Sequence, residues 1–259
     1  EVTVRWLQSF EDYLLIERKN APNTIYSNLK VIKTIINNAI QQELLPYEKS
    51  PFRNYKLQWT KTAVEFLEEK EIEALETLLL KEGSVIKMHR DMFLFAFNCG
   101  GLRISDMLKL KWRNFNGTYL TVITKKTKDP LRIKLTSNAL NILEEYRNAE
   151  SENDDFIFPC IKQETDMKDP VVQFKTISSK TTQINSNLKK IADLAGIDKP
   201  LRTHIARHSF GTIALQREIP IEIVSKLMTH SNIKQTQVYA KIVNASLDKA
   251  MDKFDVRGT

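Results

Sequence analysis

Apolar residues recur at helical spacing through the first forty residues of the chain. Residues 4–15 place apolar side chains every three or four positions, as one face of an α-helix does. Residues 20–24, with a proline at 22, interrupt this pattern and start a second helix. Its apolar face carries Ile25, Leu29, Ile32 and Ile36. Residues 1–57 are therefore predicted to form a small helical domain.

The remaining pattern predicts a larger helical domain that contains one hairpin. Residues 56–63 have no clear periodicity, so we place the interdomain linker at residues 58–63. Residues 65–80 form a predicted amphipathic helix, and Ile184, Leu188 and Ile191 mark another that ends at Gly196. A hairpin is predicted from strands at 120–123 and 131–135. The predicted fold is mainly α, with a second domain at residues 64–259 that carries a small β-sheet.

Composition favours a soluble protein with a polyanionic partner. The chain has 259 residues and a net charge of +7, and no apolar run reaches the roughly 20 residues of a membrane span. Residues 103–134 hold nine Lys or Arg against two acids. The two cysteines are too few for a disulfide framework, which fits a reducing cytoplasm. Since Glu1 already lies in a helical pattern, we expect a further segment upstream.

Four segments carry residues that suggest chemistry at a phosphate. His204 and Arg207 stand three residues apart at a predicted helix start, just after Thr203 as the predicted N-cap, so they share one face. Arg103 follows a Gly-Gly turn at another predicted helix start. A cation is unfavourable at a helix N-terminus, which attracts anions. A bound phosphate would explain why Arg103 and His204 stand at these helix starts. His230 and Tyr239 are the remaining candidates and lie downstream in the sequence.

These residue types supply what a tyrosine needs to attack a DNA phosphodiester without a metal or cofactor. A phenol has a pKa of about 10, so a neighbouring base must overcome a deficit of about 4 kcal/mol at neutral pH. Arginine and histidine donors stabilise the charge of the phosphorane, each by about 2.7–4 kcal/mol. An acid must protonate the leaving 5′ oxygen, and lysine is available for this role.

The motifs resemble those of the tyrosine recombinase (phage integrase) family. Gly-Leu-Arg-Ile-Ser-Asp at 101–106, His-x-x-Arg-His at 204–208, the later histidine and Tyr-Ala-Lys-Ile at 239–242 occur in family order and spacing. The resemblance implies that Tyr239 is the nucleophile and His204 the general base. It also implies that His230 is a further donor and that Arg103 and Arg207 bind the phosphate. It places the general acid in the hairpin turn, at Lys126, with Lys125 and Lys128 as alternatives.

Other residues allow two interpretations. Lys125 and Lys128 are solvated turn residues or phosphate contacts, and Asp106 either orients Arg103 or is a surface charge. His208 is predicted to face away from His204 and to pack in the core, so we leave it out of the site. The polar face of the second helix is solvated, or contacts DNA as the family's core-binding domain does; its candidate contacts are Thr24, Lys30 and Lys33.

Three positions depart from the family pattern. The usual glycine before the second histidine is Thr229, the usual threonine before Gly-Leu-Arg is Gly100, and the proline often found after the hairpin strand is Lys134. None of these changes removes a reactive group. They are expected to alter loop conformation, because glycine permits backbone angles that threonine resists.

The resemblance implies site-specific DNA recombination through a 3′-phosphotyrosyl intermediate, in the integration or excision of a phage or other mobile element. The expected partners are double-stranded DNA with two recombination sites and three further copies of the chain, which is a monomer when free. An accessory DNA-bending protein is a possible further partner, and the expected location is the bacterial cytoplasm. The alternatives are a type IB topoisomerase and a DNA-binding regulator without catalysis.

Overall fold

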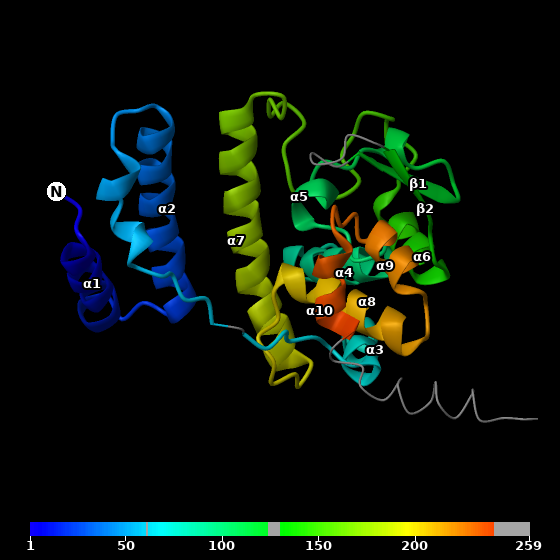
Figure 1. Cartoon of the computed structure of the whole chain (residues 1–259). Coiled ribbons are helices and arrows are strands. Elements are labelled where there is room, and N and C mark those ends of the chain that lie inside the picture. Colours follow the sequence, from blue (N-terminus) through cyan, green and yellow to red (C-terminus); the bar gives the residue numbers. More distant parts are fainter. Residues whose placement is uncertain (61, 124–129, 241–259) are drawn as a thin grey trace, which may run out of the picture. The chain divides into compact units, whose positions relative to one another are not determined.

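The computed structural model describes residues 1–60, 62–123 and 130–240. The chain divides into two compact units, Glu1–Ala63 and Val64–Thr259, and each is described here by itself (Figure 1). Helices dominate both units, and the described strands form one two-stranded sheet. The predicted fold class, mainly α with a small hairpin, is confirmed.

The smaller unit is built from two helical segments around a compact apolar core. Helix α1 (Val4–Asp12) continues into a π-helical turn, Tyr13–Glu17, and α2 (Pro22–Gln41) follows. Proline suits the first turn of α2 because its missing N–H would have no partner there. Two 3-10 turns, Tyr47–Lys49 and Pro51–Arg53, follow. The core consists of Leu7, Leu14, Ile25, Leu29, Ile36, Phe52 and Tyr55.

The two faces of α2 differ as the sequence pattern predicts. Three of the four predicted apolar residues are buried, and Ile32 packs at the edge of the same cluster. On the polar face, Thr24 and Lys30 are exposed. Lys33 is half-buried, with its ammonium group 5.7 Å from the centroid of the Phe52 ring. Contact of these three residues with DNA stays a prediction.

The larger unit holds most of the helices and the hairpin. Its elements are α3 (Glu69–Thr77), α4 (Val85–Asn98), α5 (Ile104–Met107), a 3-10 turn (Trp112–Asn114), β1 (Tyr119–Ile123), β2 (Pro130–Lys134), α6 (Ser137–Tyr146), α7 (Pro170–Leu194), α8 (Thr203–Gln216), α9 (Ile221–Leu227), a 3-10 turn (Ile233–Gln235) and α10 (Gln237–Ala240). Helix α4 lies at the centre and contacts α3, α6, α7 and α8.

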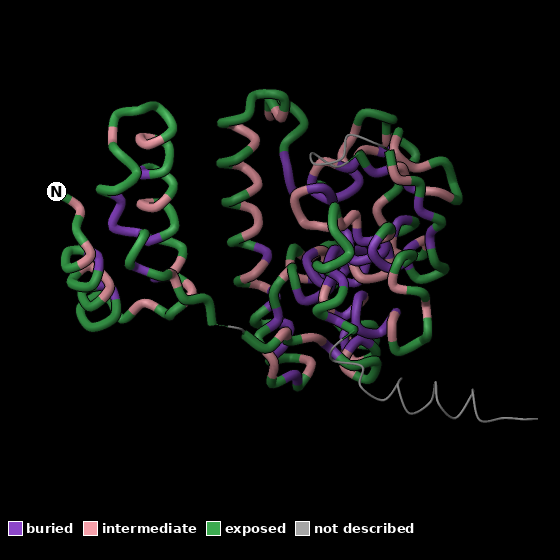
Figure 2. Tube along the Cα trace, viewed as in Figure 1, coloured by how far each residue is buried: buried purple, intermediate pink, exposed green. Residues whose placement is uncertain are grey.

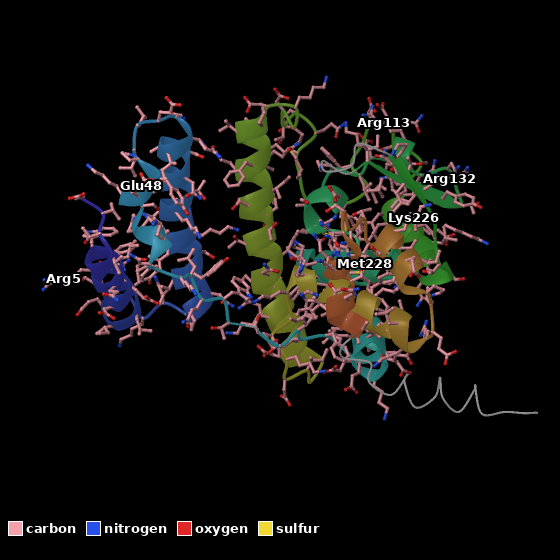
Figure 3. All side chains as sticks on the ribbon, in the orientation of Figure 1. Arg5, Glu48, Arg113, Arg132, Lys226 and Met228 are labelled. Carbon is pink, nitrogen blue, oxygen red and sulfur yellow. The ribbon has the colours of Figure 1, made fainter. Side chains whose placement is uncertain are left out.

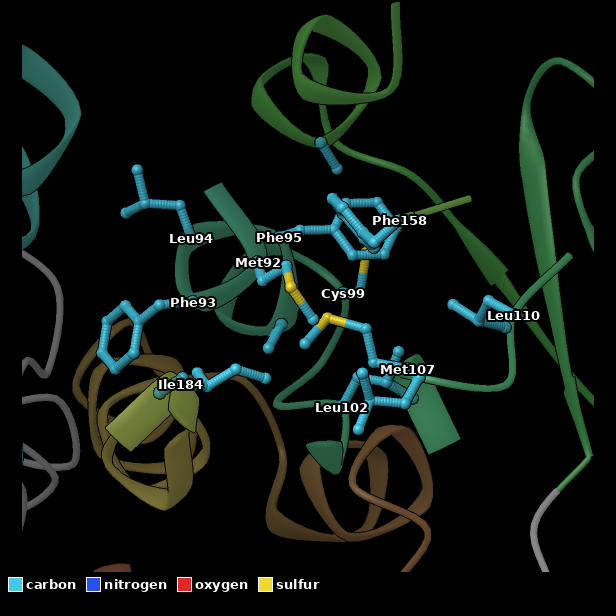
Figure 4. Close-up of a cluster of buried hydrophobic side chains, with 14 of the residues drawn as sticks. Met92, Phe93, Leu94, Phe95, Cys99, Leu102, Met107, Leu110, Phe158 and Ile184 are labelled. Atoms are coloured by element: carbon cyan, nitrogen blue, oxygen red, sulfur yellow. The ribbon is translucent and has the colours of Figure 1, made fainter. Parts of the chain in front are cut away.

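The core of the larger unit forms around α4, most of whose residues are buried (Figure 2). Phe95 is fully buried and packs edge-on against Phe158, with ring centroids 5.3 Å apart (Figure 4). Cys99 and Cys160 are buried free thiols. Burial raises the pKa of the Cys99 thiol well above its ordinary value, so it behaves as a small apolar residue.

A buried polar network fixes α4 against its neighbours. Asp91 accepts hydrogen bonds from Lys87 Nζ at 3.1 Å, Arg90 Nε at 2.6 Å and the Tyr146 hydroxyl of α6 at 2.7 Å. Arg90 also donates to the carbonyl oxygen of Leu75 in α3 at 2.9 Å. Because buried charges are stable when paired and hydrogen-bonded, this network fixes α4 against α3 and α6. The end of α4 leads directly into the Gly-Gly turn before Arg103.

Two predicted helices have different boundaries in the structure. The helix predicted at 65–80 spans Glu69–Thr77, because Glu68 and Glu71 form a capping box that starts it there. The helix that carries Ile184 begins earlier than its apolar pattern indicates. Asp169 caps its N-terminus by accepting from the backbone N–H of Val171 at 2.7 Å. This helix ends just before Gly196, whose φ is 67°, as predicted.

The predicted hairpin is present. Leu120 pairs with Ile133 and Val122 with Leu131, which directs buried residues toward the core. Arg113 and Arg132 lie on the hairpin side of the larger unit (Figure 3). The candidate general acid Lys126 and its alternatives Lys125 and Lys128 lie outside the described residues.

Among the described residues, no helix has the length and apolar character needed to cross a membrane.

Candidate active site

Helix α8 provides the central face of the candidate site. It begins at Thr203, whose backbone N–H donates to Asn185 Oδ1 of α7 at 2.9 Å. The residue at the N-cap is Arg202, so the prediction of Thr203 as the cap is wrong. Four residues at helical spacing then point to the same side: His204, Arg207, His208 and Gly211.

His208 belongs to this face, and the prediction that it points away from His204 is wrong. Residues four apart on a helix are neighbours, and the centroids of the two histidine rings lie 4.4 Å apart. His208 Nδ1 is 2.9 Å from the hydroxyl oxygen of Tyr239. Burial, together with the charges of His204 and Arg207, lowers the pKa of His208 to about 4. His208 is therefore neutral at pH 7, and a neutral imidazole can accept a hydrogen bond from the phenol.

Arg207 is buried and held by two backbone carbonyls. Nη1 donates to the Gly101 oxygen at 2.7 Å, and Nη2 donates to the Met228 oxygen. Burial and the nearby charge of Arg103 lower the pKa of Arg207 to about 10, which leaves the guanidinium charged at neutral pH. The two bonds fix the plane of the Arg207 guanidinium. Because both acceptors are neutral carbonyls, its positive charge is retained.

The Gly-Gly turn before Arg103 makes room for these contacts. Gly100 and Gly101 have φ angles of 74° and 69°, a region that favours glycine. A Cβ atom at Gly101 would lie 3.1 Å from the Cα of Arg207, and one at Gly100 would lie 3.3 Å from the Leu227 oxygen. Gly100, one of the departures from the family pattern, thus allows a close approach to the end of α9.

Arg103 stands at the N-cap position of α5 and is half-buried. Its Nη1 donates to the hydroxyl oxygen of Thr229 at 2.6 Å. Asp106 is buried, so it is not a solvated surface charge, and its carboxylate lies 3.4 Å from Lys109 Nζ. The predicted contact of Asp106 with the guanidinium of Arg103 is not among the side-chain contacts of the described residues.

The turn that ends α9 contacts both arginines, Arg207 through the Met228 oxygen and Arg103 through the Thr229 hydroxyl. We call residues 228–230 the 228–230 turn; Met228 and Lys226, at the end of α9, are labelled in Figure 3. The backbone N–H of Thr229 donates to the Lys226 oxygen, and that of His230 to the Ser225 oxygen, as in a Schellman motif. Thr229 has a φ of 53°. A β-branched residue is rarely found in this region, where strain costs about 1–3 kcal/mol.

His230 and Tyr239 complete the arrangement. His230 Nδ1 is 2.8 Å from Thr236 Oγ1, and its ring is nearly parallel to that of Tyr239, with centroids 6.4 Å apart. The Tyr239 side chain is buried, at 4% exposure. Burial raises the pKa of its hydroxyl, while the charges of Arg207 and Arg103 act in the opposite direction. Deprotonation therefore needs an acceptor, and His208 is hydrogen-bonded to the phenol.

The ring of Tyr239 rests directly on α8. A Cβ atom at Gly211 would lie 2.8 Å from Cδ2 of Tyr239, closer than atoms approach without displacement. Helices α8, α9 and α10, which supply these groups, lie together in the larger unit (Figure 1). His204, at the start of α8, is exposed, and desolvation by its surroundings and the charges of Arg207 and Arg103 lower its pKa.

The structure thus brings together five predicted residues from distant segments of the chain: Arg103, His204, Arg207, His230 and Tyr239. It adds His208, Thr229 and Gly211, which the sequence reasoning did not place in the site. In the described part of the chain, no group of three or more His, Cys, Asp or Glu side chains could hold a metal ion.

Sequence models of two protein families match this chain. The model of the phage integrase family matches residues 65–245, and that of the phage integrase SAM-like domain matches residues 1–57. The chain belongs to the phage integrase family, as its motifs predict.

Individual relatives agree with this assignment. The tyrosine recombinase XerA of Pyrococcus horikoshii is 29% identical over 173 residues, which cover 66% of this chain and 56% of that protein. XerA of Thermococcus onnurineus is 30% identical over 63% of this chain and 55% of that protein. The chain thus spans about half the length of these two relatives. The Tn1549 transposon integrase, in complex with a circular intermediate DNA, has the same fold, with a TM-score of 0.68 and 17% identity over 98% of this chain and 86% of that one.

Proposed function

We propose that this protein carries out site-specific DNA recombination by cleaving and rejoining strands through a 3′-phosphotyrosyl intermediate. The observation that carries the proposal is the buried Tyr239 hydroxyl, which is hydrogen-bonded to a neutral histidine on the helix that also bears Arg207. Family membership supports the same activity, since the relatives named above are called tyrosine recombinases. Integration or excision of a mobile element is the proposed role.

The proposed reaction is a transesterification that conserves the bond energy of the DNA. The Tyr239 oxygen attacks the phosphorus atom, the bond to the 5′ oxygen breaks, and the phenolic proton passes to a histidine. The leaving 5′ oxygen takes a proton from a general acid, for which we propose Lys126, with Lys125 and Lys128 as alternatives. The free 5′ hydroxyl of a partner strand then attacks the phosphotyrosine and releases Tyr239. The proposed reaction therefore requires neither ATP nor a cofactor.

The proposed roles of the cations follow from their positions. Arg207, fixed by two carbonyls, and Arg103, held by Thr229, flank the place of the phosphate and stabilise the charge of the phosphorane. His230 lies beside the Tyr239 ring and donates to a phosphate oxygen. His204 is the base that the sequence motifs predict, but His208 makes the contact with the phenol, so we propose that the proton goes first to His208.

Substitution of His208 tests this proton transfer. His208→Leu is expected to slow covalent attachment to DNA by about 100-fold, because general-base contributions are of that order. His208→Asn keeps an acceptor near the position of Nδ1, and we expect it to retain more of the rate. The rates are measured by gel separation of protein-linked DNA, with thermal unfolding of each variant as the control for folding. Equal rates for His208→Leu and the unsubstituted protein would show that His208 serves packing alone.

The proposed partners are two double-stranded DNA sites. The basic region at residues 103–134 and the net charge of +7 favour binding to phosphates, which would make affinity fall steeply with salt. The integrase of similar fold is bound to DNA. We propose a monomer in the free state that assembles as a tetramer on DNA, with the SAM-like domain contacting the duplex through Thr24, Lys30 and Lys33. An accessory DNA-bending protein and action in the bacterial cytoplasm belong to the same proposal.

Covalent trapping tests the proposed function. The protein is incubated with a pool of nicked duplexes made from candidate attachment DNA, in which the cleaved fragment diffuses away and the adduct accumulates. Protein-linked DNA is isolated under denaturing conditions, the modified residue is mapped by mass spectrometry, and the captured strands are sequenced. We expect adducts at Tyr239 on a narrow set of sequences.

Other outcomes of the trapping experiment separate the alternatives. Adducts on almost any sequence would favour a type IB topoisomerase. Binding without any adduct, in a pool where a known recombinase reacts, would favour either a DNA-binding regulator without catalysis or an enzyme that requires an N-terminal segment or a partner for cleavage.

A further inference from the structure

Thr229 adopts a backbone conformation that its side chain disfavours. Its φ of 53° lies in the left-handed region, where a β-branched residue is an outlier. The turn itself does not use the side chain, because its two bonds run from the backbone N–H groups of Thr229 and His230 to carbonyls of α9. Glycine would satisfy such a turn without strain. A threonine at this position therefore calls for an explanation outside the turn.

The hydroxyl of Thr229 supplies that explanation through its bond to Arg103. Arg103 Nη1 donates to Thr229 Oγ1 at 2.6 Å, across 126 positions of sequence. The N-terminus of α5 does not favour a cation, and the nearby carboxylate of Asp106 is paired with Lys109. The hydroxyl is thus the side-chain acceptor that orients this guanidinium within the described part of the chain.

The chemical nature of this acceptor also matters. A carboxylate would hold Arg103 more tightly, but it would cancel the positive charge that a phosphate needs. A hydroxyl fixes one edge of the guanidinium and leaves the net charge and the remaining donors available. Arg207 is held in the same manner, by two neutral carbonyls, one of which belongs to Met228 next to Thr229. Both arginines are therefore oriented by neutral oxygens, two of them from the 228–230 turn.

We propose that Thr229 is a positioning residue, whose hydroxyl holds Arg103 in the orientation that binds the scissile phosphate. This inference rests on the proposed function for its effect on rate. The contact itself is a property of the protein without DNA, so it is tested separately.

Three substitutions of Thr229 separate the hydroxyl from the backbone. Thr229→Ser keeps the hydroxyl, Thr229→Val keeps the β-branched shape without it, and Thr229→Gly removes both the hydroxyl and the strain. We expect Ser to cleave within about twofold of the unsubstituted rate, and Val and Gly to form the adduct about 10-fold more slowly, as for one lost hydrogen bond to a charged group. Thermal stability of Thr229→Gly is expected to be unchanged or higher, so its rate and stability move independently.

A double-mutant cycle ties the loss to Arg103. In the Arg103→Met background, the hydroxyl no longer has a donor partner at position 103, so Thr229→Gly is expected to change the residual rate by less than about twofold. The same 10-fold loss in both backgrounds would overturn the inference. Cleavage by Thr229→Val at the unsubstituted rate would also overturn it, because the hydroxyl would then have no role.

A measurement that needs no DNA tests the contact directly. Nuclear magnetic resonance of the arginine side chains reports rotation about the Nε–Cζ bond, which the hydrogen bond at Nη1 should slow. We expect slow rotation of Arg103 in the unsubstituted protein and in Thr229→Ser, and faster rotation in Thr229→Val and Thr229→Gly. Fast rotation in all four proteins would overturn the contact. Failure of the proposed function is recognised differently, as an unsubstituted protein that forms no adduct with any duplex.

Discussion

Tyr239→Phe is expected to abolish covalent attachment to DNA while leaving DNA binding intact. The substitution removes the one oxygen that the proposed phosphotyrosine requires, and the ring that packs against Gly211 and stacks near His230 is retained. Loss of the hydrogen bond to His208 should lower the free energy of unfolding by only about 0.5–1.5 kcal/mol. The variant should therefore be folded and bind the duplex with unchanged affinity.

The comparison uses two assays on the same preparation. Adduct formation is measured with the nicked duplexes, and affinity is measured by mobility shift at fixed salt, because binding to phosphates depends on salt. Tyr47→Phe is the matched control, since Tyr47 is 61% exposed in the smaller unit and should lose nothing in either assay. Normal adduct formation by Tyr239→Phe would refute the assignment of the nucleophile.

Arg207→Ala is expected to slow adduct formation by about 10²–10³-fold, as the loss of one donor to a charged transition state does. The guanidinium also occupies a buried position, and its removal leaves the Gly101 and Met228 oxygens without this partner. Each unsatisfied buried group costs about 1–3 kcal/mol, so the melting temperature should fall as well. Arg207→Lys restores a positive charge but not the planar fork that meets both carbonyls, and it should recover only part of the rate.

Arg217→Ala controls for the loss of a positive charge near the same helix. Arg217 follows α8 and pairs with Glu69 at 2.7 Å, and both side chains are exposed. An exposed ion pair contributes about 0–1 kcal/mol, so neither rate nor stability should change much. The rates are measured at a temperature well below the lowest melting transition. If folded Arg207→Ala reacts at the unsubstituted rate, Arg207 has no part in the chemistry.

Local helix geometry explains which site residues could be predicted. His204 and Arg207 were paired because residues three apart share a face, and the structure places both on α8. The same rule includes His208, because residues four apart on a helix differ by only about 40° around its axis. One residue step from Arg207 to His208 turns the side chain by about 100°, but the four-residue step from His204 returns it to nearly the same face. Helical spacing alone therefore places His208 on the face of the site, although it does not identify Tyr239 as its partner.

The contacts that hold the arginines could not be predicted in this way. The acceptors of Arg207 are backbone carbonyls, which every residue carries and no side chain identifies. Thr229 departs from the family pattern, but its bond to Arg103 joins positions 126 residues apart, which no local pattern indicates. The start of α7 was not predicted for a related reason. The first turns of α7 are exposed, with Phe174 at 75% exposure, so they lack the buried periodicity that located Ile184.

The 228–230 turn has a consequence for how mutational data on this protein combine. Three successive residues hold Arg207 through a carbonyl, Arg103 through a hydroxyl, and place a histidine beside Tyr239. A shift of this turn displaces all of these groups together. Free energies measured for single substitutions around it should therefore not sum, since residues that share partners are energetically coupled. We therefore expect the residues of the 228–230 turn to vary together when the sequence changes.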